Sequence, residues 1–431
     1  MEEKELRMHI QDGKIGHDIM ARHLMDNYIF KTFKDTEQIL IFSRKRGYYT
    51  SDSSTTIKKV IHKTLTNLGL AKQSKKGFIN EVTAYIQRST YVSRGKFNAK
   101  EHFLNINNGI LKIRTGTVIP HNPKLLSTMC IPVSFDETTR CPVIDKFFRQ
   151  IVAENDVPLL IEIVAWCLDL NSRIQRFVLF IGEGANGKST FVNLLRAFIG
   201  EKNCSSVTLQ SLSHNRFASA ELFGKFVNIY PDLPSASIKD TGRLKALTGG
   251  DAIPAERKFE HQFTFVNKAK LIFSANKPPT IDDDSYAIWR RAIIIDFPNT
   301  FAGSNRDPDL IDKLTTPEEL SGLLNLAIDK LKILREQGDF SCVPTWEGTR
   351  SKYALISDPV VEFVETKCVL DPVEEIPKPR LFTAYSKFCI QSGIPVGTNR
   401  GFGRILKNKY SRTIRERQNN WTGITLKKRK K

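Results

Sequence analysis

The sequence lacks the features that mark a secreted, membrane-spanning or zinc-binding protein. Its seven cysteines are scattered, odd in number and never paired at a two-residue spacing, and its eight histidines are equally dispersed. This usage indicates a reducing compartment and disfavours a zinc or histidine-based metal centre. The most apolar segment, residues 159–170, is interrupted by Glu162 and Asp169, and the first residues carry no apolar signal region. We therefore expect a soluble protein that acts inside the cell, is not secreted and has no membrane partner.

Acidic residues are also scarce relative to basic ones. The 431 residues include 65 Lys and Arg but only 46 Asp and Glu, which gives a formal net charge of +19. The electrostatic field of such a positive net charge favours a polyanionic partner such as nucleic acid. The alternative is a basic surface that only aids solubility. The excess is concentrated near the C-terminus, where residues 404–431 hold eleven Lys or Arg and a single acid, Glu416. This end is suited to phosphate contacts.

A glycine-rich motif predicts a phosphate-binding loop. An apolar run at residues 177–181 precedes it, and Phe191, Leu194 and Phe198 follow it at helical spacing. In this order, backbone N–H groups and a helix N-terminus can surround phosphates, while Lys188 reaches the β- and γ-phosphates and Ser189 binds Mg²⁺. The alternative is an ordinary glycine-rich turn. The predicted nucleotide-binding residues are Gly182, Glu183, Gly184, Ala185, Asn186, Gly187, Lys188, Ser189 and Thr190.

The pattern around this loop predicts an α/β fold with a mostly parallel sheet. Further buried strands are expected at residues 226–230, 270–274 and 292–296, in alternation with helices. Downstream, Thr316 with the proline that follows it begins a predicted helix, and Gly338 ends that helix. We expect this helix to form an appendage to the sheet domain.

The flanking regions predict two smaller units. Upstream, a helix at residues 17–34, a strand at 39–43, and a hairpin that turns at Asn108-Gly109 indicate an α+β module. Downstream, a proline-rich hinge precedes two helices and a basic two-stranded wing, which is typical of a winged helix-turn-helix. Its second helix would expose Arg400, Arg404 and Lys407. The predicted units are 1–140, 141–340, a linker with a helix at 341–378, and the winged unit with its basic tail at 379–431.

Polar residues at the ends of the predicted strands are candidates for nucleotide chemistry. Asp232 follows the strand at 226–230 and could hold Mg²⁺ or orient an attacking water, with a turn or cap as the alternative. Asn276 ends the next strand and could bind the γ-phosphate or the water, although a lone Asn is more often a turn former. Arg290 and Arg291 precede the last strand. At least one of them should reach a surface, where it could act on a neighbouring subunit's nucleotide or simply be solvated.

Together these motifs resemble superfamily 3 helicases of the phage, plasmid and large DNA virus primase-helicase type. The resemblance extends upstream over the module that ends near residue 150 and, more weakly, to the C-terminal unit. It implies an AAA+ P-loop NTPase core, a hexameric ring, ATP hydrolysis at subunit interfaces and movement along one DNA strand. The segments that carry it are residues 182–190, 228–234, 245–251, 254–259, 273–276 and 289–291.

The resemblance also implies roles for the candidate residues. Lys188 and Ser189 would hold ATP and Mg²⁺, and Asp232 would position Mg²⁺ or water. Asn276 would sense the γ-phosphate, and either Arg290 or Arg291 would act on the neighbouring subunit's nucleotide.

The resemblance also implies a hairpin that contacts DNA, between Asp232 and Asn276. Arg257 and Lys258 would lie near its tip and Phe259 at its base, and His261 and Phe263 then alternate as strand residues do. A surface hairpin that does not touch DNA is the alternative.

One feature of the family is not found. Its members often carry an N-terminal primase whose chemistry needs clustered metal-binding acids, whereas only about 130 residues precede the helicase region here. The nearest clusters, residues 282–284 and 307–309, are expected to be solvated loop acids. Primer synthesis would then come from a separate primase, working with a DNA polymerase, or from a portion absent from this chain.

The sequence therefore predicts an ATP-dependent DNA helicase that acts on single-stranded and forked DNA during replication of a virus, plasmid or mobile element. An initiator or packaging-type ATPase that assembles on DNA without unwinding it is the alternative. A P-loop kinase is disfavoured because it needs neither a basic wing nor paired arginines.

Overall fold

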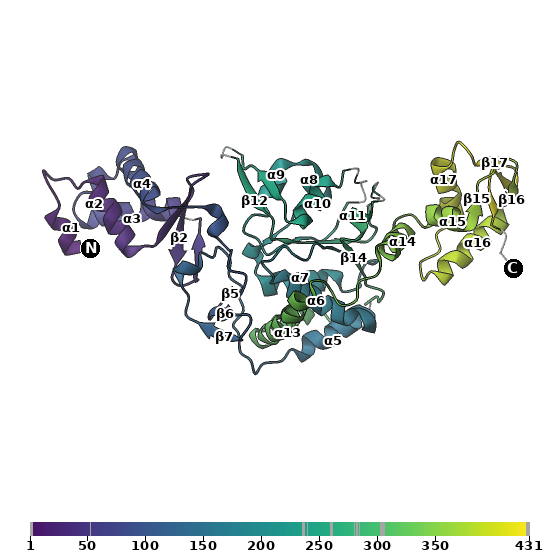
Figure 1. Ribbon diagram of the computed structural model, residues 1–431, viewed down its shortest axis with the longest axis horizontal. Coiled ribbons are helices and arrows are strands. Elements are labelled where there is room, and N and C mark those ends of the chain that lie inside the picture. The colour runs from purple at the N-terminus through teal and green to yellow at the C-terminus, as the bar shows by residue number, and fades with distance from the viewer. Residues whose placement is uncertain are drawn as a thin grey trace.

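The chain is elongated, with its two termini at opposite ends (Figure 1). A central sheet with helices on both sides lies between an N-terminal unit and a smaller C-terminal unit, which is connected through helix α14 (Trp346–Ser357). The computed structural model describes residues 3–51, 53–234, 238, 240–258, 262–279, 281, 283, 285–301 and 307–427.

The N-terminal unit packs helices against a four-stranded sheet of order β3-β2-β1-β4. The predicted helix at 17–34 is wrong over its last part, because α2 ends at Asn27 and residues 30–33 form a strand. Phe30 and Thr32 favour extended structure, pair with β2 and are buried, so sheet burial outweighs continuation of the helix. The predicted strand at 39–43 is confirmed. The elements are α1 Glu3–Met8, α2 His17–Asn27, β1 Phe30–Phe33, β2 Ile39–Ser43, β3 Tyr48–Thr50, α3 Ser53–Asn67, α4 Lys76–Thr90 and β4 Tyr91–Val92.

A three-stranded meander, β5 (Phe103–Ile106), β6 (Gly109–Lys112) and β7 (Thr117–Ile119), joins this unit to the central one. The hairpin was predicted, but its turn is one residue earlier than expected, since Ile106 pairs with Gly109. Gly109 has φ +150°, and a Cβ there would lie 2.5 Å from the Ile119 carbonyl oxygen. Glycine is therefore required by the close approach of β7.

The central unit is built on five parallel strands in the order β14-β8-β13-β10-β9. The predicted strands at 177–181, 226–230, 270–274 and 292–296 are confirmed to within a residue or so, and the short β9 was not predicted. The strands are β8 Phe177–Ile181, β9 Cys204–Ser205, β10 Val227–Tyr230, β13 Lys270–Ala275 and β14 Ala292–Asp296.

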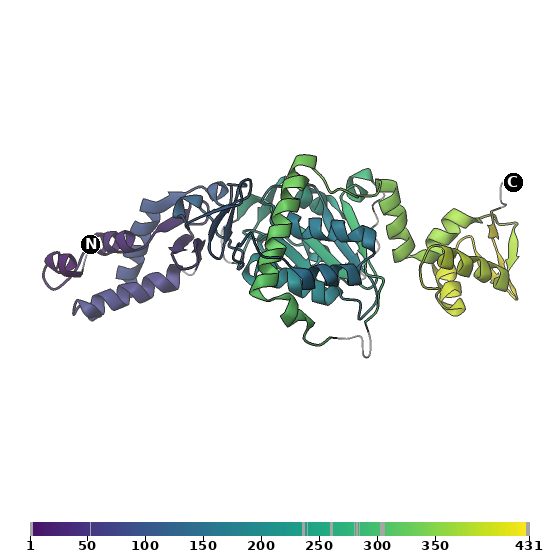
Figure 2. The ribbon, with the colours of Figure 1, turned by 90° about the horizontal axis from the view of Figure 1, so that it is seen from below.

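Alternating residues of β8 enter two different cores. Val178 and Phe180 pack with one cluster, whereas Phe177, Leu179 and Ile181 pack with the other, so both faces of the sheet are buried. Figures 1 and 2 show α5, α6, α7 and α13 along one face, opposite α8 to α11. The first group is α5 Pro142–Ile151, α6 Val157–Cys167, α7 Lys188–Ile199 and α13 Pro317–Gln337, with α12 Leu310–Leu314 beside it. The second is α8 Leu209–His214, α9 Arg216–Ala220, α10 Gly242–Gly249 and α11 Tyr286–Trp289, with the hairpin β11 Ala252–Ala255 and β12 Phe263–Val266.

Helix α13 has the predicted ends. Thr316 accepts a hydrogen bond from the Glu319 N–H (3.3 Å), and Gly338 closes the helix with φ +77°. The Glu319 carboxylate is directed to another helix, where it accepts from the N–H groups of Val143 (3.2 Å) and Ile144 (3.0 Å) at the start of α5. One acid thus joins two helices on the same face of the sheet.

The C-terminal unit contains the two predicted helices and the predicted strand pair. Thr398 caps α17 by accepting from the Gly401 N–H (3.1 Å), and a third strand gives a sheet of order β16-β18-β17. Its core includes Val360 and Phe363 from α15, a segment that we had assigned to the linker. The elements are α15 Pro359–Lys367, β15 Cys368–Val369, β16 Glu375–Pro377, α16 Lys378–Gln391, α17 Asn399–Lys409, β17 Arg415–Arg417, β18 Asn420–Thr422 and β19 Thr425–Leu426.

In the part of the chain that the structure describes, no helix combines the length and the apolar character needed to cross a membrane.

Candidate functional site

The predicted phosphate-binding loop joins β8 directly to α7. Gly187 stands just before the helix with φ +87°, and a Cβ there would lie 2.5 Å from Ile151 Cγ2. Gly182 has φ +155°, and a Cβ there would lie 2.7 Å from the Phe297 carbonyl oxygen. By contrast, Gly184 has open space around it. Backbone conformation and close packing therefore require glycine at both ends of the loop, while its apex is exposed.

The segment after β14 holds the loop from its other side. The Phe301 N–H donates to the Ala185 carbonyl (2.7 Å), and Asn186 Nδ2 donates to the Phe297 carbonyl (3.2 Å). Ala185 has φ +59°, an uncommon conformation for a residue with a side chain. The hydrogen bond from Phe301 helps to hold this conformation. The shape of the loop therefore depends on the segment after β14 as well as on β8.

Lys188 lies on the first turn of α7 and is 6% exposed. Its Nζ donates to the carbonyls of Gly182 and Glu183 (2.9 Å to the latter) and to Asn186 Oδ1 (3.0 Å). Burial lowers the pKa of Lys188 to about 8, and the carboxylate of Asp232 acts in the opposite direction. The ammonium group is thus desolvated and surrounded mainly by neutral oxygens, an arrangement that an added anion would stabilise.

The carboxyl ends of three adjacent strands bring the other predicted groups to the same edge. In the sheet, Ile181 pairs with Ala275 and Phe273 pairs with Tyr230, so the loop, Asn276 and Asp232 follow neighbouring strand ends. Both Asp232 and Asn276 are exposed. Ligands of open parallel sheets bind at this edge, where the strand order reverses. The structure therefore brings together three of the predicted groups that are distant in the sequence.

Ser189 and Asp232 are the predicted Mg²⁺ ligands, and both are exposed at this edge. Among the described residues, no group of three or more His, Cys, Asp or Glu side chains could hold a metal ion. A hydroxyl and one carboxylate suit Mg²⁺, which usually takes few protein ligands and completes its shell with water and phosphate oxygens.

Arg290 and Arg291 lie at the opposite edge of the sheet from the loop, where the strands β8 and β14 begin. The Phe177 N–H donates to the Arg291 carbonyl (2.8 Å), so both arginines are level with the start of β8 rather than with the loop at its end. Arg291 is 8% exposed, and its Nη1 donates to the Ala287 carbonyl. Arg290 is half-buried. The expectation that one arginine reaches the surface therefore favours Arg290.

Gln175 links the two arginines and was not predicted. Its Oε1 accepts from Arg290 Nη2 (2.9 Å) and Arg291 Nη2 (3.2 Å), while its Nε2 donates to the Gly249 carbonyl (3.1 Å). Burial lowers the pKa of Arg291, and the charge of Arg290 lowers it further. A neutral acceptor between two cations fixes their orientation without cancelling their charge. Only its position two residues before a predicted strand could have drawn attention to it.

The predicted hairpin is present as β11 and β12. Ala255 pairs with Phe263, whose side chain is buried, while the strand residues between the buried ones are exposed. Near the tip, Lys258 is exposed and the Arg257 guanidinium lies 6.0 Å from the centre of the Phe263 ring. The predicted positions of Phe259 and His261 lie outside the described residues.

The three cations predicted on the second C-terminal helix, Arg400, Arg404 and Lys407, are exposed on α17. Lys407 forms an ion pair with Glu416 on β17, and Lys378 pairs with the same carboxylate (2.5 Å). Hydrogen bonds from these two lysines lower the pKa of Glu416 to about 2. Lys407 is therefore partly neutralised, and Arg400 and Arg404 are the stronger candidates for phosphate contacts.

The prediction that the acidic clusters are solvated is wrong for Asp283, whose side chain is 16% exposed. It accepts hydrogen bonds from the Thr241 hydroxyl, Lys245 Nζ (2.9 Å) and the Ser285 N–H (2.9 Å). Burial acts to raise its pKa, but these hydrogen bonds outweigh burial and hold the pKa below its usual range. The other two acids of that cluster lie outside the described residues. Asp307 is exposed and pairs with Lys313 (2.7 Å).

Two family models match separate parts of the chain. A family described as "D5 N terminal like" matches residues 20–153, and a family of unknown function, DUF5906, matches residues 180–291. The second match covers the loop, both strand-end candidates and the arginine pair.

Curated viral proteins are similar over about half of the chain. A putative helicase of Acanthamoeba polyphaga mimivirus is 27% identical over 214 residues, which cover 46% of this chain and 22% of that protein. A putative primase of African swine fever virus is 22% identical over 231 residues, which cover 50% of this chain and 24% of that protein. The alignments thus span only about a quarter of the viral relatives. Among solved structures, the C-terminal region of NrS-1 aligns over 94% of this chain and 98% of its own, with 13% identity and a TM-score of 0.47.

Proposed function

We propose that this chain, which belongs to the primase-helicase family of phages and large DNA viruses, is a ring-forming helicase that uses ATP to move along single-stranded DNA. The observation that carries the proposal is the division of the candidate residues between two edges of one parallel sheet, one at the carboxyl ends of its strands and one at their amino ends. A nucleotide-binding edge and an arginine-bearing edge on opposite sides suit a subunit that completes its neighbour's site.

At the first edge, the proposed P-loop of an AAA+ core cradles the ATP phosphates. Its backbone N–H groups and the N-terminus of α7 favour the negative charge, and Lys188 neutralises it. Mg²⁺ bound through Ser189 and Asp232 would polarise the terminal phosphate. Asn276, at the adjacent strand end, is positioned to bind the γ-phosphate or the attacking water.

At the second edge, Arg290 is the residue that we propose acts in trans. The five residues from Phe177 to Ile181 separate the level of the arginines from the loop by about 16 Å, at roughly 3.3 Å per residue. An arginine side chain does not span that distance within its own subunit. A second copy packed against the nucleotide edge would bring a guanidinium to the phosphates, as cyclic symmetry allows in a hexamer.

The DNA contacts that we propose lie on two cationic elements. Arg257 and Lys258 near the hairpin tip would follow the phosphates of the threaded strand. Arg400 and Arg404, on the second helix of a proposed winged helix, would engage the duplex at a fork. A separate primase and a DNA polymerase are the further partners that we propose, because unwinding at a fork serves strand synthesis.

Strand separation on a forked duplex tests this function directly. We expect ATP and Mg²⁺ together to release the labelled strand, and single-stranded DNA to stimulate ATP hydrolysis. An initiator or packaging-type ATPase would show stimulated hydrolysis without strand release, and that result would overturn the helicase proposal. Omitting Mg²⁺ provides the control for spontaneous melting.

Affinity for ATP should fall as the pH rises through about 8. Lys188 has a pKa of about 8 without nucleotide, and a bound triphosphate would raise this pKa because an anion favours the charged form. Binding above this pH must therefore take up a proton, and log Kd should increase by up to about one per pH unit. Calorimetric titrations from about pH 7.5 to 9.5 measure this. Lys188→Arg keeps its charge and should give a flat profile, whereas a flat wild-type profile contradicts the argument.

A further inference from the structure

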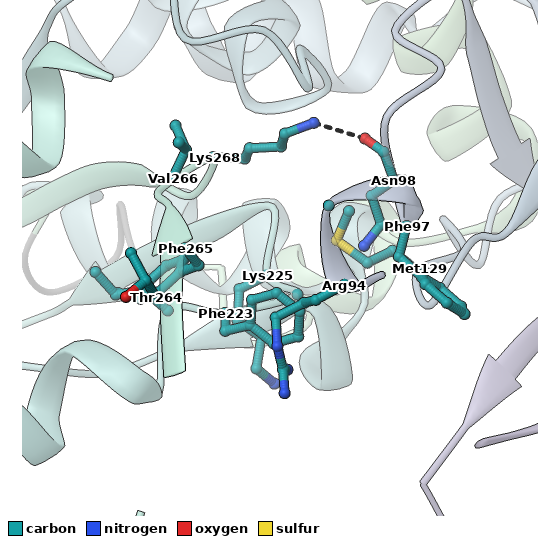
Figure 3. Close-up of a pocket in the computed structure, with 13 residues that line it drawn as sticks. Arg94, Phe97, Asn98, Met129, Phe223, Lys225, Thr264, Phe265, Val266 and Lys268 are labelled. Carbon is teal, nitrogen blue, oxygen red and sulfur yellow. Dashed lines mark hydrogen bonds between the residues drawn. The ribbon is translucent and has the colours of Figure 1, made fainter. Parts of the chain in front are cut away.

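A cavity of about 340 Å³ lies between the hairpin and the N-terminal unit (Figure 3), and the described residues that line it include none of the predicted phosphate-binding loop at 182–190. Thr264, Phe265 and Val266 of β12 form one side, and Phe97, Asn98 and Met129 lie across from them. Its volume falls at the lower end of the range of about 300–1,000 Å³ typical of small-molecule sites. The cavity therefore has room for one small ligand held between two units of the chain.

Its wall is cationic. Arg94, Lys225 and Lys268 line it, and none of the described residues that line it is acidic. Arg94 already has a partner, since it forms a bidentate pair with Asp35 (2.7 and 2.9 Å). The two lysines instead donate to neutral backbone carbonyls, Lys225 to Lys202 (2.5 Å) and Lys268 to Asn98 (2.7 Å). Among the residues that the structure describes, these two positive charges thus have no directly bonded carboxylate.

These lysines carry an electrostatic cost that an anion would relieve. Burial lowers the pKa of both Lys225 and Lys268, and nearby acids oppose this only in part. Those acids act from outside the lining, Glu221 and Glu201 on Lys225, and Glu101 and Asp169 on Lys268. Two desolvated cations in the lining of one cavity are typical of a binding site.

The cavity also has aromatic side chains and, among the described residues, one polar atom without a hydrogen-bond partner. Phe223 and Phe265 line it with ring centres 5.7 Å apart. The Arg94 guanidinium stacks on Phe223 at 4.6 Å and on Phe263 at 4.3 Å. Arg94 is 7% exposed, and within the described part of the chain its Nη1 has no hydrogen-bond partner. A planar ligand could stack here while its anionic group meets the cations.

We infer that this cavity binds a nucleoside phosphate, with the base against Phe223 and Phe265 and the phosphate toward Lys225 and Lys268. The ligand is either a free nucleotide or a nucleotide of the DNA strand that passes the hairpin. Because β12 forms one wall, occupancy would fix the hairpin against the N-terminal unit. This second site does not depend on ATP hydrolysis at Lys188.

Titration of the full-length protein with 2′-deoxyadenosine 5′-monophosphate tests the inference, with Lys188→Ala included to disable the other site. We expect saturable binding in both proteins and a loss of about tenfold in affinity for Lys225→Gln and for Lys268→Gln, since each removes a charge-assisted contact. Lys146→Gln, which removes an exposed lysine on α5, should bind as the wild type does. Binding that disappears in Lys188→Ala, or that both cavity lysine variants retain, would overturn the inference.

A steric variant keeps the test independent of charge and folding. Val266 lines the cavity and is 41% exposed, so Val266→Trp should block the site without removing a cation, and thermal unfolding checks that it folds. Adenosine alone and inorganic phosphate alone should each bind more weakly than the nucleotide. Equal binding of a small dicarboxylate would contradict the nucleotide assignment.

Competition with oligothymidylate separates the two sources. If the strand supplies the nucleotide, the oligonucleotide displaces the monophosphate, and Lys225→Gln weakens both. If the source is free nucleotide, the two bind independently and only monophosphate binding is weakened. A third outcome is that the oligonucleotide displaces the monophosphate but Lys225→Gln leaves both affinities unchanged. The shared site would then lie elsewhere, and the inference would be overturned.

Discussion

Replacing Lys188 with alanine should reduce ATP turnover to below about a hundredth of the wild-type rate, because one charge aimed at the transferring phosphate is typically worth 10²–10³ in turnover. The fold should survive. Lys188 is buried, burial lowers its pKa, and its described hydrogen-bond partners are all neutral oxygens. Removing it therefore relieves a desolvated charge and does not break an ion pair. A coupled assay of phosphate release with excess single-stranded DNA measures the change.

The matched control is Lys202→Ala, which removes an exposed lysine just beyond the other end of α7. It should leave turnover unchanged. Static binding of DNA should also persist in Lys188→Ala, since the cations of the hairpin and α17 lie on other elements. If Lys188→Ala hydrolyses ATP at the wild-type rate, the proposal that this loop binds the nucleotide is wrong.

Local patterns predicted which candidate groups lie together at the carboxyl ends of the strands. Continuous apolar runs identify β8, β13 and β14 because strands buried on both faces need no polar alternation. The loop is recognisable because its glycines and Lys188 fall within one short segment, residues 182–188. Asp232 and Asn276 could then be inferred, since the carboxyl ends of parallel strands meet at one edge.

Contacts between distant segments could not be predicted in this way. Gln175 meets Arg290 and Arg291 across 115 and 116 residues, and Arg94 meets Asp35 across 59. Asp283 looked like a solvated loop acid because nothing nearby in the sequence indicates that Lys245 is its partner. No periodicity encodes such pairs; the packing of whole elements creates them.

Mixing two inactive variants should restore ATP hydrolysis if Arg290 acts across a subunit interface. Arg290→Ala keeps its own loop, and Lys188→Ala keeps its own arginine, so each alone lacks one half of every site. In equally mixed rings, about one interface in four combines an intact loop with an intact arginine, and activity should approach that fraction if sites act independently. Phosphate release measured across mixing ratios should be highest near equal proportions.

Arg291 and Gln175 provide the comparison within the same cluster. Arg291→Ala removes a buried guanidinium bonded to the Ala287 carbonyl and should lower the thermal unfolding temperature more than Arg290→Ala does. Gln175→Ala removes the acceptor that the two arginines share without removing their charge, so it should reduce turnover less than Arg290→Ala and leave ATP affinity unchanged. If no mixture of Arg290→Ala and Lys188→Ala releases phosphate faster than the two variants do separately, the proposal that Arg290 acts in trans is wrong. Rescue by Arg291→Ala in place of Arg290→Ala would instead make Arg291 the residue that crosses the interface.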